Sequence, residues 1–288
     1  MLITFGLLGL SICAAWLPPI RIGDRYRISP WLLLFIAAIA AGLLSGYLTE
    51  FGIVELGALA IAAYFAGRSE ANRSQRILFG SVAIVLALAL AMHRLPGFNN
   101  PVLIENMKFS ADAKPFTQYA NFDKASVGLI FLVFLCNRAS SMLDWKEILR
   151  RTIPIALLTT AATMLVALTI GHVRPDLKLS SFTPVFLAAN LLFTCVAEEA
   201  FFRGFLQDRL AKSLVRVRFG GHMAVLCSGI LFGIAHAAGG PRNMMLATLS
   251  GLGCAYAYSI VQRVEAPIIT HFTLNAVHFV GFTYPQLQ

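Results

Sequence analysis

The sequence predicts an all-α protein that crosses a membrane many times. The composition is too apolar for a soluble protein, the apolar residues form long runs, and positive charges alternate between the loops. Of the 288 residues, 58% are hydrophobic and 13% are charged, and the mean hydropathy is +0.73. A soluble domain has about 45–50% apolar and about 25% charged residues. The excess apolar surface must therefore face lipid, which excludes a soluble enzyme, a disordered chain and a disulfide-stapled secreted domain.

Ten apolar runs are candidate membrane-spanning helices, because about 20 residues cross the hydrocarbon core and the backbone there must satisfy its own hydrogen bonds. The runs cover residues 2–20, 31–48, 51–67, 77–92, 125–136, 153–170, 184–196, 223–238, 244–261 and 268–282. The fifth run is short enough to be re-entrant, and the third and fourth could form a tight hairpin. We therefore expect about ten transmembrane helices, with eight as the lower bound.

The loop charges predict how the chain is oriented. With the N-terminus outside, the inner loops contain 15 Lys and Arg residues and the outer segments contain 7. The inner loops are 21–27, 68–76, 138–151, 204–222 and 262–267. Since cytoplasmic loops are enriched in Lys and Arg, this distribution favours ten spans with both termini outside. It also accounts for the net charge of +9 without a nucleic-acid partner.

Ionisable residues inside a span are costly, so each suggests a function. The seventh apolar segment continues into Glu198, Glu199 and Arg203. Glu199 and Arg203 are four residues apart and could form an ion pair along the helix. Glu198 lies about 100° away around the helix, so the two carboxylates face different surroundings. A buried charge network that only holds helices together is the alternative interpretation.

Two later spans also contain polar residues. His236 is the only His, Asp, Glu, Lys or Arg between Met223 and Ala238, and a histidine in the core of the bundle is the simpler interpretation. His271, Asn275 and His278 share roughly one face of the last span, because they are four and three residues apart. A polar stripe of this kind faces protein or water and not lipid. We expect His278 to have a supporting or structural role.

These side chains suggest hydrolysis. A carboxylate and an imidazole can together deprotonate a water molecule, and desolvation brings their pKa values toward neutrality. An Asn amide and a second His can donate hydrogen bonds to a developing oxyanion. Because no Ser or Cys adjoins these residues in the sequence, water is the expected nucleophile. The pattern indicates cleavage of an acyl bond in a membrane-embedded cavity.

Three short motifs carry a resemblance to a known family. E-E-x-x-x-R at residues 198–203, F-x-x-x-H at 232–236 and H-x-x-x-N at 271–275 occur in this order on successive apolar segments. Together they resemble the CPBP family, which includes the CAAX-processing endopeptidases and their prokaryotic relatives. The similar part, residues 184–282, is about a third of the chain.

The resemblance implies a glutamate-dependent intramembrane endopeptidase. Glu198 would be the general base, and His236 would help to hold and activate the water. Asn275 and His271 would form the oxyanion site, while Glu199 and Arg203 would orient Glu198.

We expect no cofactor and no metal. Two histidines and a carboxylate can bind catalytic zinc, so Glu198, His236 and His271 are the ligands to consider if a metal is used. The usual zinc-protease signature H-E-x-x-H does not occur in the sequence.

The sequence also divides the chain and suggests partners. We expect an N-terminal transmembrane region at 1–183, with about six helices and a long outer loop at 93–124, and a four-helix catalytic bundle at 184–282. Loops of that length are often lids or binding loops. The expected substrate is a membrane-associated protein or lipidated peptide, cut near its C-terminus or membrane anchor, and the expected location is a bacterial inner membrane. A transporter with a proton pathway and a non-catalytic scaffold or immunity-type protein remain alternatives.

Overall fold

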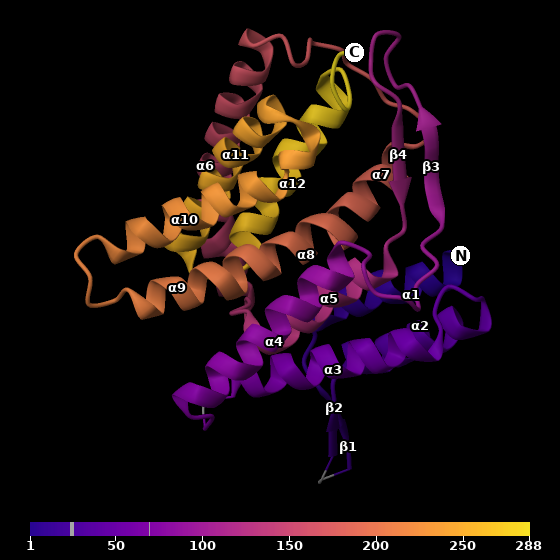
Figure 1. Ribbon diagram of the computed structural model, residues 1–288, viewed down its shortest axis with the longest axis vertical. Coiled ribbons are helices and arrows are strands. Elements are labelled where there is room, and N and C mark those ends of the chain that lie inside the picture. Colours follow the sequence, from indigo (N-terminus) through magenta and orange to yellow (C-terminus); the bar gives the residue numbers. More distant parts are fainter. Residues whose placement is uncertain (24–25, 69) are drawn as a thin grey trace. The chain divides into compact units, whose positions relative to one another are not determined.

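The computed structural model describes residues 1–23, 26–68 and 70–288, which are mostly helical (Figure 1). Its main helices are α1 (Leu2–Cys13), α2 (Pro30–Leu44), α3 (Glu50–Gly67), α4 (Arg73–Ala91), α5 (Phe122–Leu135), α6 (Met142–Thr169), α7 (Thr183–Ala189), α8 (Val196–Glu199), α9 (Asp208–Ser213), α10 (Gly220–Ala235), α11 (Pro241–Val261) and α12 (Glu265–Gly281). Two short hairpins pair β1 (Ile20–Ile22) with β2 (Tyr26–Ile28) and β3 (Val102–Met107) with β4 (Phe116–Tyr119).

Each of the ten predicted runs lies largely within a helix, and the predicted all-α polytopic membrane fold is confirmed. Among the described residues, five helices are long and apolar enough to cross a membrane: α3, α4, α6, Thr183–Ser213 and α11. The helices Leu2–Trp16, α2 and α10 are apolar but shorter. Arg25, one of the charges counted in the first inner loop, lies outside the described residues.

The chain forms two compact units made of interleaved segments. The first unit contains Met1–Val102, Tyr119–Cys136 and Leu192–Ala200, and the second contains Leu103–Gln118, Asn137–Leu191 and Phe201–Gln288. The helix Thr183–Ser213 therefore gives its middle to the first unit and its ends to the second. The expected division of the sequence at residue 184 stays a prediction.

The first unit is built around α5, which has ten of its fourteen residues buried. Helices α1, α3, α4 and α8 pack against it. Helices α5 and α8 approach closely at Gly128, where an added Cβ would lie 2.7 Å from the Cα of Ala197. Only a residue without a side chain allows this contact between the two helix backbones.

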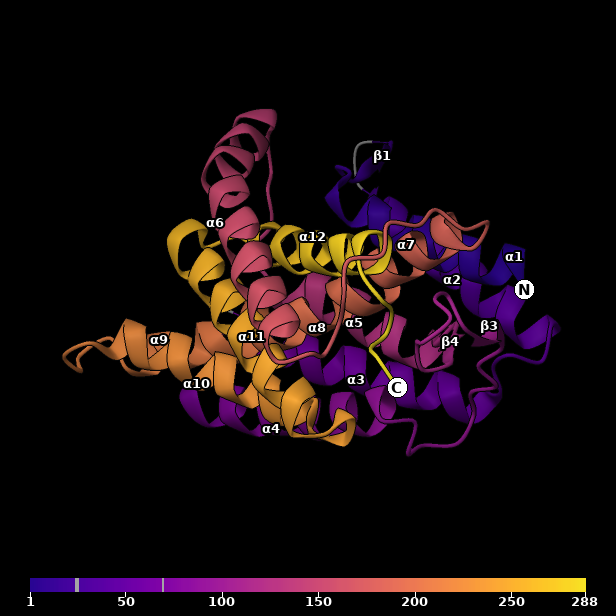
Figure 2. The same cartoon turned by 90° about the horizontal axis from the view of Figure 1, so that it is seen from above.

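The second unit is a bundle in which α11 packs against α6, α10 and α12 (Figure 2). Glycines bring α10 and α11 together: a Cβ at Gly229 would lie 2.6 Å from Leu252, and one at Gly233 would lie 1.9 Å from Thr248. Such small-residue contacts are the usual way for membrane helices to approach closely. Small residues therefore line the contact of the helix pair that carries His236.

Loops that are expected on one side of the membrane lie together in the second unit. The turn after β3 meets the segment after α6 and the C-terminal residues, through pairs such as Arg174 with Asp112 and Ala113 with Leu287. At the other end of the bundle, Ala139 donates its backbone N–H to Glu265 at 2.7 Å. This grouping agrees with the predicted alternation of these loops, and which side is outside stays a prediction.

The contact at Gly128 leads to a test of the first unit. We expect Gly128→Ala to lower the free energy of unfolding by about 1–3 kcal/mol, because the new methyl group overlaps the backbone of α8. Gly57, on α3, has open space at its Cβ position. Gly57→Ala should instead stabilise by about 0.5–1 kcal/mol, since alanine restricts the unfolded chain. Thermal unfolding in detergent measures both, and equal effects would contradict the close contact.

Candidate active site

The two predicted carboxylates lie on a helix with an unusual form. In Thr183–Ser213, the short α8 that carries Glu198 and Glu199 is flanked by two π-helical segments, Asn190–Cys195 and Ala200–Gln207. π-Helical turns are rare and occur frequently at functional sites. Because Arg203 lies in the second of these segments, the regular α-helical spacing assumed for the Glu199–Arg203 pair does not apply, and that pair stays a prediction.

Glu198 forms an ion pair inside the first unit. The Nζ atom of Lys124, on α5, lies 2.7 Å from Oε1 of Glu198, and the two side chains are only 20% and 15% exposed. Lys124 is one helical turn before Gly128, so the close approach of α5 and α8 brings the ammonium to the carboxylate. Sequence analysis missed this partner because it counted Lys124 as a loop charge. Its position directly before an apolar run was the available signal.

The start of α5 is held by a polar network next to Lys124. The carboxylate of Asp123 is 2% exposed, lies 2.6 Å from Nδ1 of His93, and accepts a hydrogen bond from Asn100 at 3.1 Å. Asn100 also accepts the backbone N–H of Phe122 at 2.8 Å, and Asp123 accepts that of Lys124. These bonds satisfy the free N–H groups of the helix N-terminus and fix the backbone from which Lys124 extends.

Arg203 belongs to the second unit and is fully buried. Its Nη2 donates to the carbonyl oxygen of Gly251 at 2.8 Å, and its guanidinium lies 4.4 Å from the ring centre of Phe232. The ring of Phe232 also contacts His236, at 4.5 Å between ring centres, and His271, at 5.5 Å. The arginine, the phenylalanine and both predicted catalytic histidines therefore form one continuous cluster.

The backbone fixes the tautomer of His236. This residue ends α10, and its Nδ1 lies 2.8 Å from the carbonyl oxygen of Phe232 one turn earlier. Because a carbonyl oxygen only accepts hydrogen bonds, Nδ1 must carry the proton. In the neutral ring Nε2 is then the basic nitrogen, as proton transfer from water requires.

Asn275 has a partner that sequence analysis missed. Its Nδ2 donates to Oδ1 of Asn190 at 3.1 Å, and Asn190 is 7% exposed at the start of the first π-helical segment. This bond fixes the plane of the Asn275 amide and so directs its second N–H. A lone Asn in the apolar run 184–196 was the signal that could have identified it.

Three of the predicted site residues of the second unit, but not Arg203, line one cavity of about 130 Å³. His236, His271 and Asn275 border it, together with His172 and His278. At about 30 Å³ per water molecule, this volume holds a few waters. The cavity can therefore provide water, a proton acceptor and an amide donor inside an otherwise apolar bundle. Glu198 and Glu199 belong to the first unit.

A metal centre is not evident in the described parts of the chain. Within residues 1–23, 26–68 and 70–288, no three His, Cys, Asp or Glu side chains gather as a metal site requires. The alternative zinc ligands combine Glu198 of the first unit with His236 and His271 of the second. Independence from metal stays a prediction.

Fold and cavity define a class of protein: this is a multi-pass integral membrane protein with a polar cavity inside a helical bundle. Residues 180–277, about a third of the chain, match the family described as type II CAAX prenyl endopeptidase Rce1-like. The match confirms the predicted resemblance over this segment and indicates, at the level of the family, a CAAX-type membrane peptidase. The matched segment includes all six predicted site residues. Neither a curated protein nor a solved structure matches the chain.

The Lys124–Glu198 pair can be measured without an activity assay. A double-mutant cycle with Lys124→Met and Glu198→Gln should give a coupling energy of about 1–2 kcal/mol, because the pair is charged and largely shielded from water. Arg94, an exposed cation of the same unit, is the matched control, and Arg94→Met should not couple with Glu198→Gln. Chemical unfolding in detergent provides the free energies, and a coupling near zero for Lys124 would contradict the ion pair.

Proposed function

We propose that this protein is an intramembrane endopeptidase of the CAAX-protease type, in which Glu198 and His236 activate a water molecule. The observation that carries the proposal is the cavity bordered by His236, His271 and Asn275, within the segment that matches the peptidase family. We assign Glu198 as general base, His236 as the group that holds the water and shares its proton, and Asn275 with His271 as the oxyanion site.

The reaction needs only groups of this chain and water. Glu198 takes a proton from the water molecule while the water oxygen attacks the carbonyl carbon of the peptide bond. The carbonyl oxygen becomes an oxyanion and accepts hydrogen bonds from the Asn275 amide and the His271 ring. The C–N bond then breaks, and the proton passes to the leaving nitrogen. The products are a carboxylate and an amine.

The surrounding contacts support these roles. The bond from Nδ1 of His236 to Phe232 leaves Nε2 as the basic nitrogen, and the bond to Asn190 fixes the Asn275 amide. Lys124 donates a hydrogen bond to the Glu198 carboxylate at 2.7 Å and so holds this side chain in place. We propose that Glu199 and Arg203 orient the site. Arg203 would do so by holding Phe232 against both histidines.

The substrate we propose is a membrane-associated protein or lipidated peptide that reaches the cavity from the bilayer. Cleavage would occur near its C-terminus or membrane anchor. We also propose a bacterial inner membrane as the location, both termini outside, and a reaction without metal. A transporter or a non-catalytic scaffold would keep the fold without hydrolysis, and the following assay separates these alternatives.

Purified protein should cleave members of a fluorogenic lipidated-peptide library in detergent. Glu198→Gln and His236→Ala should each lower kcat by about 10²–10⁴-fold, because each removes a proton-transfer group. Asn275→Ala should lower it by about 10²–10³-fold, through loss of an oxyanion donor. Activity of the wild type should survive a strong zinc chelator.

Matched controls are available on exposed parts of the second unit. Glu105→Gln and His222→Ala change the same side-chain types at exposed positions outside the cavity, and they should keep the wild-type rate. Loss of activity with the chelator would make Glu198 and the histidines metal ligands. Unchanged cleavage by Glu198→Gln would reject the glutamate mechanism, and binding of peptides without cleavage would favour a scaffold.

A further inference from the structure

A second cavity of about 400 Å³ adjoins the one described above. His172 lines both cavities, so the two are neighbours within the second unit. We call the larger one the vestibule. Its walls come from the segment after α6, the start of α11, Lys114 in the β3–β4 connection and the C-terminal residues from Gln286 onward.

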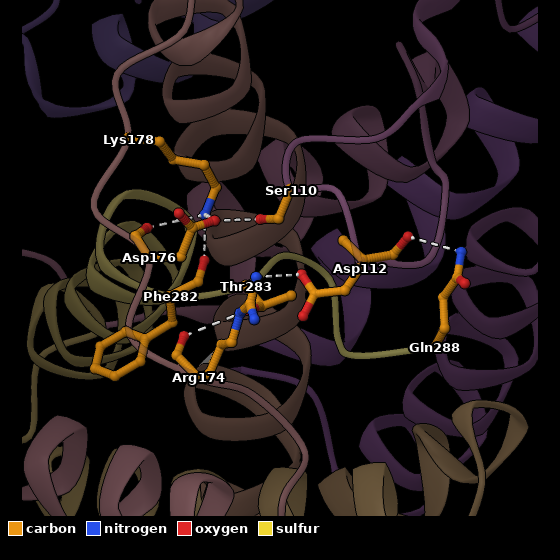
Figure 3. A network of polar contacts seen from close by, with 9 residues as sticks. Ser110, Asp112, Arg174, Asp176, Lys178, Phe282, Thr283 and Gln288 are labelled. Atoms are coloured by element: carbon orange, nitrogen blue, oxygen red, sulfur yellow. Dashed lines mark hydrogen bonds and ion pairs between the residues drawn. The ribbon is translucent and has the colours of Figure 1, made fainter.

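A network of polar contacts joins the segments that lie next to the vestibule (Figure 3). Ser110 donates to Asp176, whose pKa this bond lowers, and Nη2 of Arg174 lies 2.9 Å from Asp112. Lys178 donates to the carbonyl oxygen of Phe282. The backbone of the C-terminal residues is also held: Lys114 donates its N–H to Gln286 and Leu287 donates to His172, both at 3.0 Å.

In this network Asp112 and Asp176 pair with other residues, and the charged side chains that line the vestibule are cationic. The ten described residues that line it include Lys114 and Arg242 but no Asp or Glu. Neither cation forms an ion pair within the part of the chain that the structure describes. The charged side chains that line the vestibule are thus both cationic, and together they attract an anion.

His172 lies where the two cavities meet. It is 8% exposed and borders both cavities, and no hydrogen bond or ion pair of its ring is recorded with the described residues. Burial, together with the charges of Arg242 and Lys114, keeps the pKa of His172 below its ordinary value. A neutral imidazole between the two cavities can donate its N–H to an anion held by the cations.

We propose that the vestibule binds the C-terminal carboxylate of the peptide substrate, through Lys114, Arg242 and His172. This inference rests on the proposed function, because it places the scissile bond in the neighbouring cavity. The carboxylate is the one anionic group that every peptide carries on its C-terminal side, whatever its sequence. The vestibule is in the size range of small-ligand sites, so it takes only the last residues of a chain. The protease is thereby restricted to bonds near a free C-terminus.

The test compares two peptides that differ only at the C-terminus, one with a free carboxylate and one with an amide. The wild type should show a KM about tenfold lower for the acid, equivalent to about 1.4 kcal/mol. Arg242→Gln and Lys114→Gln should each reduce this ratio to about threefold or less, with kcat unchanged, since exposed charge pairs are individually weak. Arg242→Lys should keep the preference. Lys146→Gln, an exposed cation outside the vestibule, should behave as the wild type.

Binding provides a readout that does not need catalysis. Fluorescent versions of both peptides, N-methylated at the scissile bond, are titrated into the purified wild type and variants. If the acid binds more tightly than the amide, and this difference becomes smaller in Arg242→Gln, the vestibule binds the carboxylate. This conclusion holds even if the cleavable peptides are not hydrolysed. Absence of hydrolysis would contradict only the proposed function.

Other outcomes overturn the inference. The vestibule does not bind the carboxylate if the acid and the amide bind equally well. The same conclusion follows if the preference for the acid persists when both cations are replaced. Displacement of both peptides alike by anionic lipid in nanodiscs would make it a headgroup site.

Discussion

The organisation of the second unit depends on one buried cation. A guanidinium inside an apolar bundle is costly unless its donors and its charge are satisfied nearby. Two of the contacts that Arg203 makes are with the carbonyl oxygen of Gly251 on α11 and the ring face of Phe232 on α10. The same ring contacts His236 and His271, so the position of the charge sets that of Phe232 and, through it, of both imidazoles. Arg203 is thus at the centre of the cluster that contains the two histidines.

That arrangement is possible because glycine lines the contact between α10 and α11. At Gly251 a Cβ would lie 3.0 Å from the carbonyl oxygen of Gly229 and 3.1 Å from Phe232. A side chain there would move Phe232 away from the guanidinium and separate the helices. The polar cluster can therefore form only because the residues at this helix contact are small. In the first unit Gly128 has the same role for the Lys124–Glu198 pair.

The sequence predicted the fold and the chemical groups because both depend on local signals. Apolar runs predicted the helices, and Glu198, His236 and Asn275 stood out as polar residues in apolar surroundings. Their partners could not be predicted: Lys124 is 74 residues before Glu198, and Asn190 is 85 residues before Asn275. These pairings exist only in the tertiary structure. The two π-helical segments around α8 and the interleaving of the two units were also unforeseen, since neither follows from periodicity.

The structure also changes how the loop charges are understood. Lys124 was counted with the outer loops, but it lies in α5 and pairs with Glu198, so it does not help to orient the chain. Without it the asymmetry of 15 against 7 becomes 15 against 6, in favour of the predicted orientation. In that orientation Lys114 and Arg242 are cations on the disfavoured side. Arg174 and Lys178 on the same side have Asp112 and Asp176 as partners, whereas Lys114 and Arg242 have no ion-pair partner within the described residues. Both cations line a cavity beside the histidines. Binding of an anionic group of the substrate would explain why they lie on that side.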